Sequence, residues 1–373
     1  MSAYALTTLW YERQRFLPAV LAVAFSALLI ALQCGLLLGL FSITSIPIDE
    51  SNADVWVGHP KVPSVDLGRP IPEVWSSYIA PLPEVERTEP FMEGFSYWDK
   101  PNGGMELTLV IGSRLGPDAI GAVKELTAEH RTRLYELGTV VVDAGEFDRL
   151  GVTKVGDTAE VNGKRVRIVG TVHGLRSLAG PYLFCSLDTA RMILHPPSGQ
   201  TTFLLAKCHR KDQAAAVVDK LRMYPGKLAP FTQEGFSLQS RLHWLTKTKA
   251  GIALGLAAAL GLLVGAIVTS QTLYSATIAS LKEYAVLRAL GIPRWRMRMM
   301  VVSQAFWVGV SGVALALPAI FVLAGFGTEV GAKVLLPWWL LSGAIGVTMS
   351  MAILSGIVAL RSLRRVEPVT LLR

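Results

Sequence analysis

Charged residues are absent from four long stretches of this chain, residues 16–48, 250–281, 299–328 and 334–360. Each stretch exceeds the ~20 apolar residues that a helix needs to cross a bilayer. Ion pumps and proton-coupled carriers generally need ionisable groups inside the membrane, and none occurs in these stretches. The sequence therefore predicts four transmembrane helices and disfavours a secondary transporter.

The sequence also lacks the short motifs of common catalytic and nucleotide-binding sites. It has no Gly-x-Ser-x-Gly elbow, no His-Glu-x-x-His and no Gly-x-x-x-x-Gly-Lys-Ser/Thr. Its six histidines show no paired ligand spacing, and the adjacent Cys208 and His209 would point to opposite faces of a strand. We therefore predict a non-catalytic membrane subunit with no cofactor or metal site of its own.

Cysteine is scarce, with three residues in the chain. Cys34 lies within the first apolar stretch. Cys185 and Cys208 lie in apolar runs that we interpret as strands of an exported domain, where a disulfide is permitted. A Cys185–Cys208 disulfide and two buried free thiols fit the sequence equally well.

Basic residues, by contrast, are concentrated beside the apolar stretches. Residues 1–15, 282–298 and 361–373 together hold eleven Lys and Arg against three Asp and Glu, which accounts for the whole formal charge of +8. The positive-inside rule places these segments, and with them both termini, in the cytoplasm. Membrane topology already explains the excess of Lys and Arg, so no nucleic-acid partner is expected.

The apolar run from Phe16 to Ile48 is too long for the ~7–15-residue core of a cleaved signal peptide, so helix 1 is predicted to be an uncleaved anchor. The predicted fold class is membrane α-helical, with an α+β extracytoplasmic domain inserted between helices 1 and 2. The predicted segments, in chain order, are a cytoplasmic amphipathic N-terminal helix (1–15), transmembrane helix 1 (16–46), the extracytoplasmic α+β domain (47–249), transmembrane helix 2 (250–281), a cytoplasmic coupling helix and loop (282–298), transmembrane helix 3 (299–326), a short extracytoplasmic loop (327–334), transmembrane helix 4 (335–360) and a cytoplasmic tail (361–373).

The extracytoplasmic domain combines strand and helix patterns. Asn162-Gly163 between two β-rich runs predicts a hairpin over Thr158–Gly170. Helices are predicted at Pro117–Leu137 and at Asp212–Met223, the latter with Asp212 as N-cap. Residues 58–90, with seven prolines, are expected to be irregular or extended, and residues 224–248 to form a connector. Further strands are predicted at Leu107–Ile111, Thr139–Val142, Tyr182–Leu187 and Thr202–Lys207.

The segment between helices 2 and 3 has a more defined pattern than a loop needs for topology alone. Residues 282–290 have helical character with an apolar side formed by Ala285, Val286 and Leu290. Gly291 fits the position just after a helix, and Pro293 prevents direct continuation. The pattern predicts a short cytoplasmic helix followed by a basic turn.

This segment, from Glu283 to Gly291, resembles the cytoplasmic motif of MacB/FtsX-type ABC transporter permeases. The C-terminal residues 359–373 are similar to the closing motif of that family, and Tyr11–Arg15 to its N-terminal pattern. Residues 140–190 resemble its extracytoplasmic core. The layout, with one domain between helices 1 and 2, is most similar to the DevC-like subgroup.

The resemblance implies a homodimeric permease in the bacterial cytoplasmic (inner) membrane. A separate ABC ATPase subunit would bind ATP and dock on the helix at 282–290, and a periplasmic membrane-fusion subunit is a further partner that the family allows. The implied function is export of an unidentified substrate by mechanotransmission. The residues implied in ATPase coupling are Lys282, Glu283, Ala285, Val286, Leu287, Arg288, Leu290, Gly291, Pro293 and Arg294.

Three other functions stay open at this point. One is FtsX-like signalling to a cell-wall hydrolase, and another is release of lipoprotein or lipid from the outer leaflet. A membrane-anchored sensor or adhesin without an ATPase is the third, and it leaves the segments at 282–291 and 359–373 unexplained. Nothing in residues 49–249 identifies a substrate.

Overall fold

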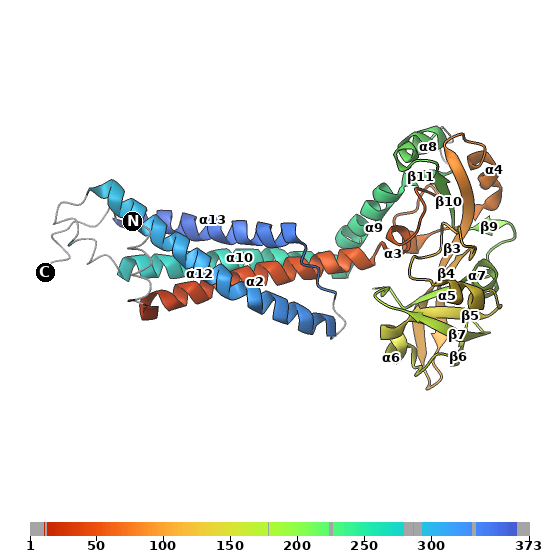
Figure 1. The fold of residues 1–373 in the computed structure, drawn as a ribbon, viewed down its shortest axis with the longest axis horizontal. Helices are drawn as coiled ribbons and strands as arrows, with labels where there is room; N and C mark the ends of the chain where they lie inside the picture. Colours follow the sequence, from red (N-terminus) through yellow and green to blue (C-terminus); the bar gives the residue numbers. More distant parts are fainter. Residues whose placement is uncertain are drawn as a thin grey trace. The chain divides into compact units, whose positions relative to one another are not determined.

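The computed structural model describes residues 11, 13–177, 179–223, 227–279, 286, 293–329 and 333–363. The chain divides into two compact units (Figure 1). We call Met1–Gly39 together with Ile252–Arg373 the helical unit, and Leu40–Gly251 the sheet unit. The predicted fold class, four membrane helices with an α+β domain between the first and second, is confirmed.

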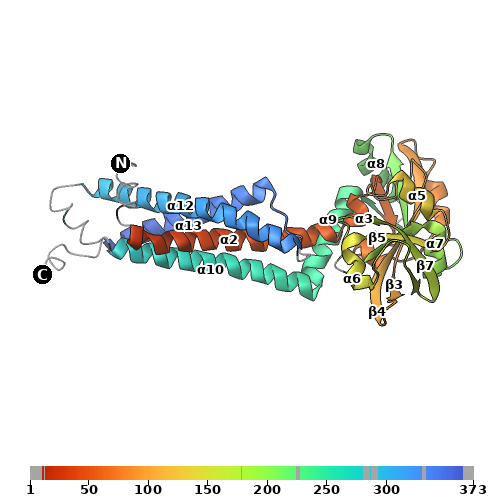
Figure 2. The same cartoon turned by 60° about the horizontal axis from the view of Figure 1, so that its bottom comes forward.

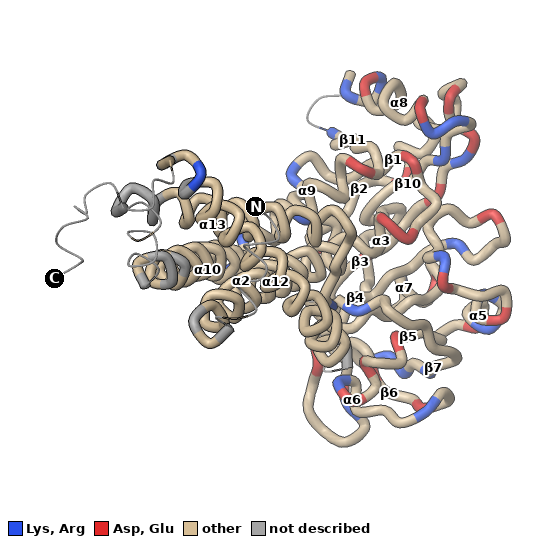
Figure 3. Tube along the Cα trace, turned by 60° about the vertical axis from the view of Figure 1, so that its left-hand side comes forward, with Lys and Arg blue, Asp and Glu red and all other residues tan. Residues whose placement is uncertain are grey.

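Four long helices form the helical unit (Figure 2). They are α2 (Arg13–Ile43), α10 (Lys249–Ala279), α12 (Arg294–Glu329) and α13 (Trp338–Leu363). Each contains a segment long and apolar enough to cross a membrane, and these segments are Phe16–Ile43, Gly251–Thr272, Met299–Gly327 and Trp338–Ile357. Acidic and basic residues lie mostly on the sheet unit, and the middle parts of the four helices carry none (Figure 3).

Small residues bring α2 close to α10 and to α12. The Ser26 hydroxyl on α2 lies 3.0 Å from the carbonyl oxygen of Gly265 and 2.8 Å from the hydroxyl of Thr269, both on α10. On α12, a Cβ atom added to Gly312 would lie 2.6 Å from Cγ1 of Val23 on α2. The helix backbones therefore approach at distances that only glycine permits at these positions.

The sheet unit is built on a nine-stranded sheet in the order β11-β1-β10-β3-β4-β8-β5-β7-β6. Strand β3 also pairs with β6, so six of the strands close into a ring. Neighbours are antiparallel except for β4–β8 and β5–β7. A separate pair is formed by β2 (Ile71–Pro72) and β9 (Gln200–Thr201). The nine strands are β1 (Val55–Gly58), β3 (Val85–Asp99), β4 (Met105–Ser113), β5 (Thr139–Asp143), β6 (Thr158–Val161), β7 (Lys164–Val172), β8 (Tyr182–Ser186), β10 (Phe203–Cys208) and β11 (Ala229–Thr232).

Short helices connect these strands, and three of them begin with a hydroxyl cap. Thr127, Ser186 and Thr232 each accept a hydrogen bond from a backbone N–H in the first turn of α5, α7 and α9. The α-helices are α3 (Ile46–Asp49), α4 (Ser76–Ile79), α5 (Ala128–Leu134), α6 (Phe147–Leu150), α7 (Leu187–Leu194), α8 (Ala214–Leu221) and α9 (Gln233–Lys247), and the 3₁₀ turns are η1 (Val65–Leu67), η2 (Glu73–Trp75), η3 (Ala144–Glu146) and η4 (Lys211–Gln213).

An aromatic cluster fixes α9 to the sheet. The Trp56 ring on β1 lies 5.1 Å from that of Phe91 and 5.5 Å from that of Phe203, both edge to face. Phe236 of α9 stands 5.8 Å from Trp56, and all four side chains are fully buried. Edge-to-face packing of this kind adds to the free energy gained from burial alone. The helix that leads to the second membrane span is therefore anchored in the core.

Most sequence predictions for this unit are confirmed. The hairpin turns at Asn162 and Gly163, whose φ angles are 51° and 72°, and Val161 pairs with Lys164 across it. The four other predicted strands correspond to β4, β5, β8 and β10. Residues 58–90 are largely irregular, although they include η1, η2, β2, α4 and the start of β3.

The predicted helix over Pro117–Leu137 is wrong in its first half. Only Ala128–Leu134 is helical, and the preceding residues form a buried loop that contributes Ile120 and Val123 to the core. The backbone N–H of Ile120 donates to the Glu89 carboxylate at 3.0 Å. A loop can supply apolar residues to a core when a polar side chain, here that of Glu89, forms hydrogen bonds with the loop backbone.

Two other predictions need correction. Asp212 is not the N-cap of α8, because its carboxylate pairs with the Arg210 guanidinium within a 3₁₀ turn and α8 begins at Ala214. The segment 224–248 is more than a connector, since it contains β11 and the 15-residue helix α9.

The Cys185–Cys208 disulfide is contradicted by the fold. Both cysteines are free and buried, on β8 and β10. Strands β3 and β4 lie between them, so three strand spacings of about 4.8 Å separate the two positions. A disulfide needs Cα atoms within about 7 Å. Burial instead raises the pKa of the Cys208 thiol to about 11.

One carboxyl group in the core is unusual. Glu93 on β3 is 4% exposed, and neither of its side-chain oxygens has a hydrogen-bond partner among the described residues. Burial, and secondly the negative charge of Asp66, raises the pKa of Glu93 well above its ordinary value. The folded state therefore holds a proton on this group more tightly than the unfolded chain does.

Replacing Glu93 should change how stability depends on pH. Because the pKa of Glu93 is raised in the folded state, its contribution to the unfolding free energy is fully present below about pH 4.3, the pKa of an unfolded glutamate. This contribution declines as the pH rises toward the pKa of the folded state. Glu93→Gln keeps the shape without titrating. We expect its gain in unfolding free energy over the wild type to grow between about pH 5 and about pH 8. Urea unfolding of the full chain in detergent measures this, and the exposed Glu125→Gln serves as the control. An unchanged difference between the two pH values would contradict the argument.

Close helix packing gives a second prediction. Gly312→Leu would press a side chain into Val23 and should destabilise the bundle by about 1–3 kcal/mol. Gly346 on α13 has open space around it, so Gly346→Leu is a matched control that should leave the bundle intact. Thermal unfolding of the purified protein in detergent compares the two variants. Equal midpoints would show that α2 and α12 do not pack at Gly312.

Candidate functional site

The predicted coupling segment lies mostly outside the described residues. This holds for Lys282, Glu283, Ala285, Leu287, Arg288, Leu290 and Gly291, and also for residues 1–10, 12 and 364–373 of the predicted terminal segments. Val286 is helical and 52% exposed. Helix α12 begins at Arg294, directly after Pro293, and the Arg296 N–H donates to the Pro293 carbonyl at 3.0 Å. The role of these residues stays a prediction.

Two short helices join the sheet to the chain segments that lead into the first two spans. Helix α3 follows α2, and α9 precedes α10. The Arg241 side chain of α9 donates to the Ser45 hydroxyl at 2.8 Å and to the Asp49 carboxylate at 2.6 Å. Ser45 in turn donates to Asp49 at 2.6 Å. We call Ser45, Asp49 and Arg241 the clamp, since they hold the entry and exit of the sheet unit together.

Further hydrogen bonds support the clamp from α9. The Gln233 side chain donates to the Ile48 carbonyl at 3.0 Å, and the Trp244 indole N–H donates to the Asp66 carboxylate at 3.2 Å. Ser240, which is fully buried, accepts a hydrogen bond from the Val65 N–H at 3.1 Å. Helix α9 is thus tied both to α3 and to the segment around η1.

The end of α2 has its own link to the sheet. The Tyr182 hydroxyl on β8 donates to the Ile43 carbonyl at 3.5 Å, and the tyrosine is 2% exposed. Burial, and next the charge of Glu93, raises the pKa of Tyr182, so the hydroxyl keeps its proton and remains a donor. Ile43 is the last residue of α2.

The helical backbone is interrupted on both sides of the clamp. Between α2 and α3 stand Thr44 and Ser45, and Pro47 lies in the first turn of α3. After α9, Thr248 is extended, with φ −96° and ψ 145°. Its hydroxyl accepts from the Gly251 N–H at 3.1 Å. Non-helical residues therefore separate α2 from α3 and α9 from α10.

The clamp joins α3 to α9 through side-chain hydrogen bonds. Among the described residues, no group of three or more His, Cys, Asp and Glu could hold a metal ion. The sequence did not point to the clamp, because residues 224–248 were interpreted as a connector. Thr232 as N-cap and Phe236 as a buried anchor are the signals that would have revealed α9.

Comparison with known proteins finds a family match for the C-terminal part of the chain. Residues 255–368 match the family model described as FtsX-like permease C-terminal. No curated protein matches the chain. Among solved structures, the chain is similar to the periplasmic region of MacB from Actinobacillus actinomycetemcomitans, with 11% identity over 50% of this chain and 92% of that one and a TM-score of 0.34. It is also similar to the extracellular domain of the noncanonic ABC-type transporter YknZ from Gram-positive bacteria, with 11% identity, 48% and 100% coverage and a TM-score of 0.34.

The matched residues include most of α10, all of α12 and α13, and the whole predicted coupling segment. The match does not extend to Tyr11–Arg15 or to residues 140–190, which the sequence also likens to the family. The DevC-like subgroup stays a prediction. Residues 255–368 are thus similar to the C-terminal part of FtsX-like permeases, in agreement with the MacB/FtsX-type permease that the sequence predicts.

Proposed function

We propose that this chain is the membrane subunit of a bacterial ABC exporter of the mechanotransmission type. Two copies of the chain would work together. The ATPase would be a separate chain, because this sequence has no P-loop motif of its own. The observation that carries the proposal is the FtsX-like permease match over residues 255–368, which contains the segment at 282–291.

The docking surface for the ATPase is the helix at 282–290. Its apolar residues would be buried against the ATPase, and Glu283, Arg288 and Arg294 would form polar contacts at the rim. The charge bias of the sequence supports placing this segment, and both termini, in the cytoplasm. The sheet unit would then work on the opposite side of the membrane, where a membrane-fusion subunit is a candidate partner.

Movement of the spans would reach the sheet unit through the clamp. Arg241 binds Ser45 and Asp49 by charge-assisted hydrogen bonds, which fix direction as well as distance. The aromatic cluster around Trp56 and Phe236 makes α9 part of the core. A shift of either span would therefore move the sheet unit as one body.

Changes in the coupling segment should separate ATP hydrolysis from the permease. Glu283→Ala or a bulky replacement of Gly291 is expected to lower permease-stimulated ATPase activity about tenfold, equivalent to about 1.4 kcal/mol of coupling free energy, while membrane insertion is kept. Co-purification with the ATPase and ATP turnover in liposomes measure both.

Glu329→Ala is the matched control, since it makes the same chemical change on the predicted opposite side of the membrane. Replacement of the whole segment 282–291 by a Gly/Ser linker is the strongest form of the test. Unchanged assembly and activity in that variant would refute the proposal.

The clamp gives a second test. Arg241→Ala removes two hydrogen bonds of a partly exposed group and should cost about 1–2 kcal/mol locally. We expect the ATPase still to bind, while ATP-dependent changes in hydrogen exchange of the sheet unit are lost. Arg167→Ala, which breaks the exposed pair with Glu136 at 2.5 Å, is the control. If both variants keep the ATP-dependent changes, the clamp does not transmit movement.

A further inference from the structure

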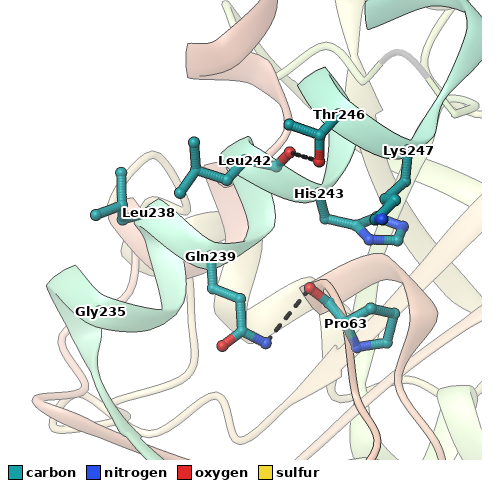
Figure 4. A pocket seen from close by; sticks show the side chains of 8 residues that line it. All are labelled: Pro63, Gly235, Leu238, Gln239, Leu242, His243, Thr246 and Lys247. Atoms are coloured by element: carbon teal, nitrogen blue, oxygen red, sulfur yellow. Dashed lines mark hydrogen bonds between the residues drawn. The ribbon is translucent and has the colours of Figure 1, made fainter.

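A groove of about 430 Å³ runs beside α9 (Figure 4). Leu238 and Leu242 line it and are 58% and 48% exposed, at a spacing of one helical turn. Pro63 also lines it, and the Gln239 amide donates to the carbonyls of Val62 and Pro63 at 3.0 and 3.4 Å (Figure 4). The groove is therefore largely apolar and open to solvent, and hydrogen bonds hold part of its lining in place.

One end of this groove is basic. His243 and Lys247 line it and share a helix face at the i,i+4 spacing. Among the described residues, Lys247 has no ion pair. The acidic residue of α9, Glu234, is bound to Lys211 at 3.1 Å. A ligand that fits should carry a negative group beside an apolar body.

The basic end lies within reach of the bilayer surface. Lys247 precedes Gly251, the first residue of the second apolar span, by four positions. Since consecutive Cα atoms are 3.8 Å apart, the two residues are separated by no more than about 15 Å in any arrangement of the two units. The lipid headgroup layers extend several ångströms beyond the hydrocarbon core on each side. The tether therefore keeps Lys247 close to phosphate groups.

We propose that the α9 groove binds an anionic phospholipid from the leaflet next to the sheet unit. Lys247 and His243 hold the phosphate, and Leu238, Leu242 and Pro63 contact the upper part of an acyl chain. This site goes beyond the proposed function and does not depend on ATP coupling. It would keep α9, and with it the clamp, in contact with the membrane surface.

A second copy of the chain fits the groove less well. In a two-fold contact the same patch serves both partners, so two copies of Lys247 would enter one interface. Glu234 is already bound to Lys211 and cannot balance them. Burying like charges without partners is costly. The charge of the groove favours an anionic lipid.

Photo-crosslinking in nanodiscs tests this. The full chain carries benzoylphenylalanine in place of Leu242, and a control chain carries it in place of Leu137, which is 59% exposed. Each chain is placed in nanodiscs of phosphatidylcholine alone and in nanodiscs of equal parts phosphatidylcholine and phosphatidylglycerol. We expect lipid adducts at position 242 in the mixed bilayer, with phosphatidylglycerol enriched about fivefold, as one basic residue near an anionic surface would give. Intact-protein mass spectrometry counts the adducts.

Charge reversal completes the test. Lys247→Glu should remove the enrichment, while Lys164→Glu on β7, the same change elsewhere on the sheet unit, should keep it. The proposal is overturned by equal adducts of the two lipids at position 242, by as many adducts at position 137, or by an enrichment that survives Lys247→Glu. A protein–protein adduct at position 242 would instead identify a second copy as the occupant, and would also overturn it.

Discussion

The structure depends on one constraint, which is that the chain must enter and leave the sheet unit at a single place. Arg241 meets this requirement by binding Ser45 and Asp49, residues almost two hundred positions earlier in the chain. This contact, together with the bond from Gln233 to Ile48, joins α3 to α9. The aromatic cluster around Trp56 continues the connection into the core of the sheet unit.

Buried polar groups accompany this base. Asp66 accepts from Trp244, Tyr182 donates to Ile43, and Glu93 lies buried without a partner among the described residues. A core made only of apolar side chains could slide as α9 or α2 moved. Hydrogen bonds with defined partners instead fix the register of both segments. The cost is a buried carboxyl group, that of Glu93, whose pKa burial raises well above its ordinary value.

The sequence predicted the parts of the fold that depend on local patterns. Missing charges revealed the four spans, and Asn162-Gly163 revealed a hairpin because only that kind of dipeptide fits its backbone angles. Pro117 misled the prediction, since the residues after it form a loop in which Glu89 accepts a hydrogen bond from the Ile120 N–H. Cys185 and Cys208 share a sheet, but their distance depends on strand order, which no local pattern contains. The clamp was not predicted, because residues 224–248 were expected to form a connector and not the helix that carries Arg241.

The joined ends of the sheet unit have an evolutionary consequence. Because Ser45 and Arg241 touch, the whole insertion behaves as a cassette whose two cut points lie side by side. Recombination could exchange such a cassette between permeases and leave the bundle contacts at Ser26, Gly265 and Gly312 untouched. The sheet unit could then change in sequence while the contacts within the helical unit stay the same.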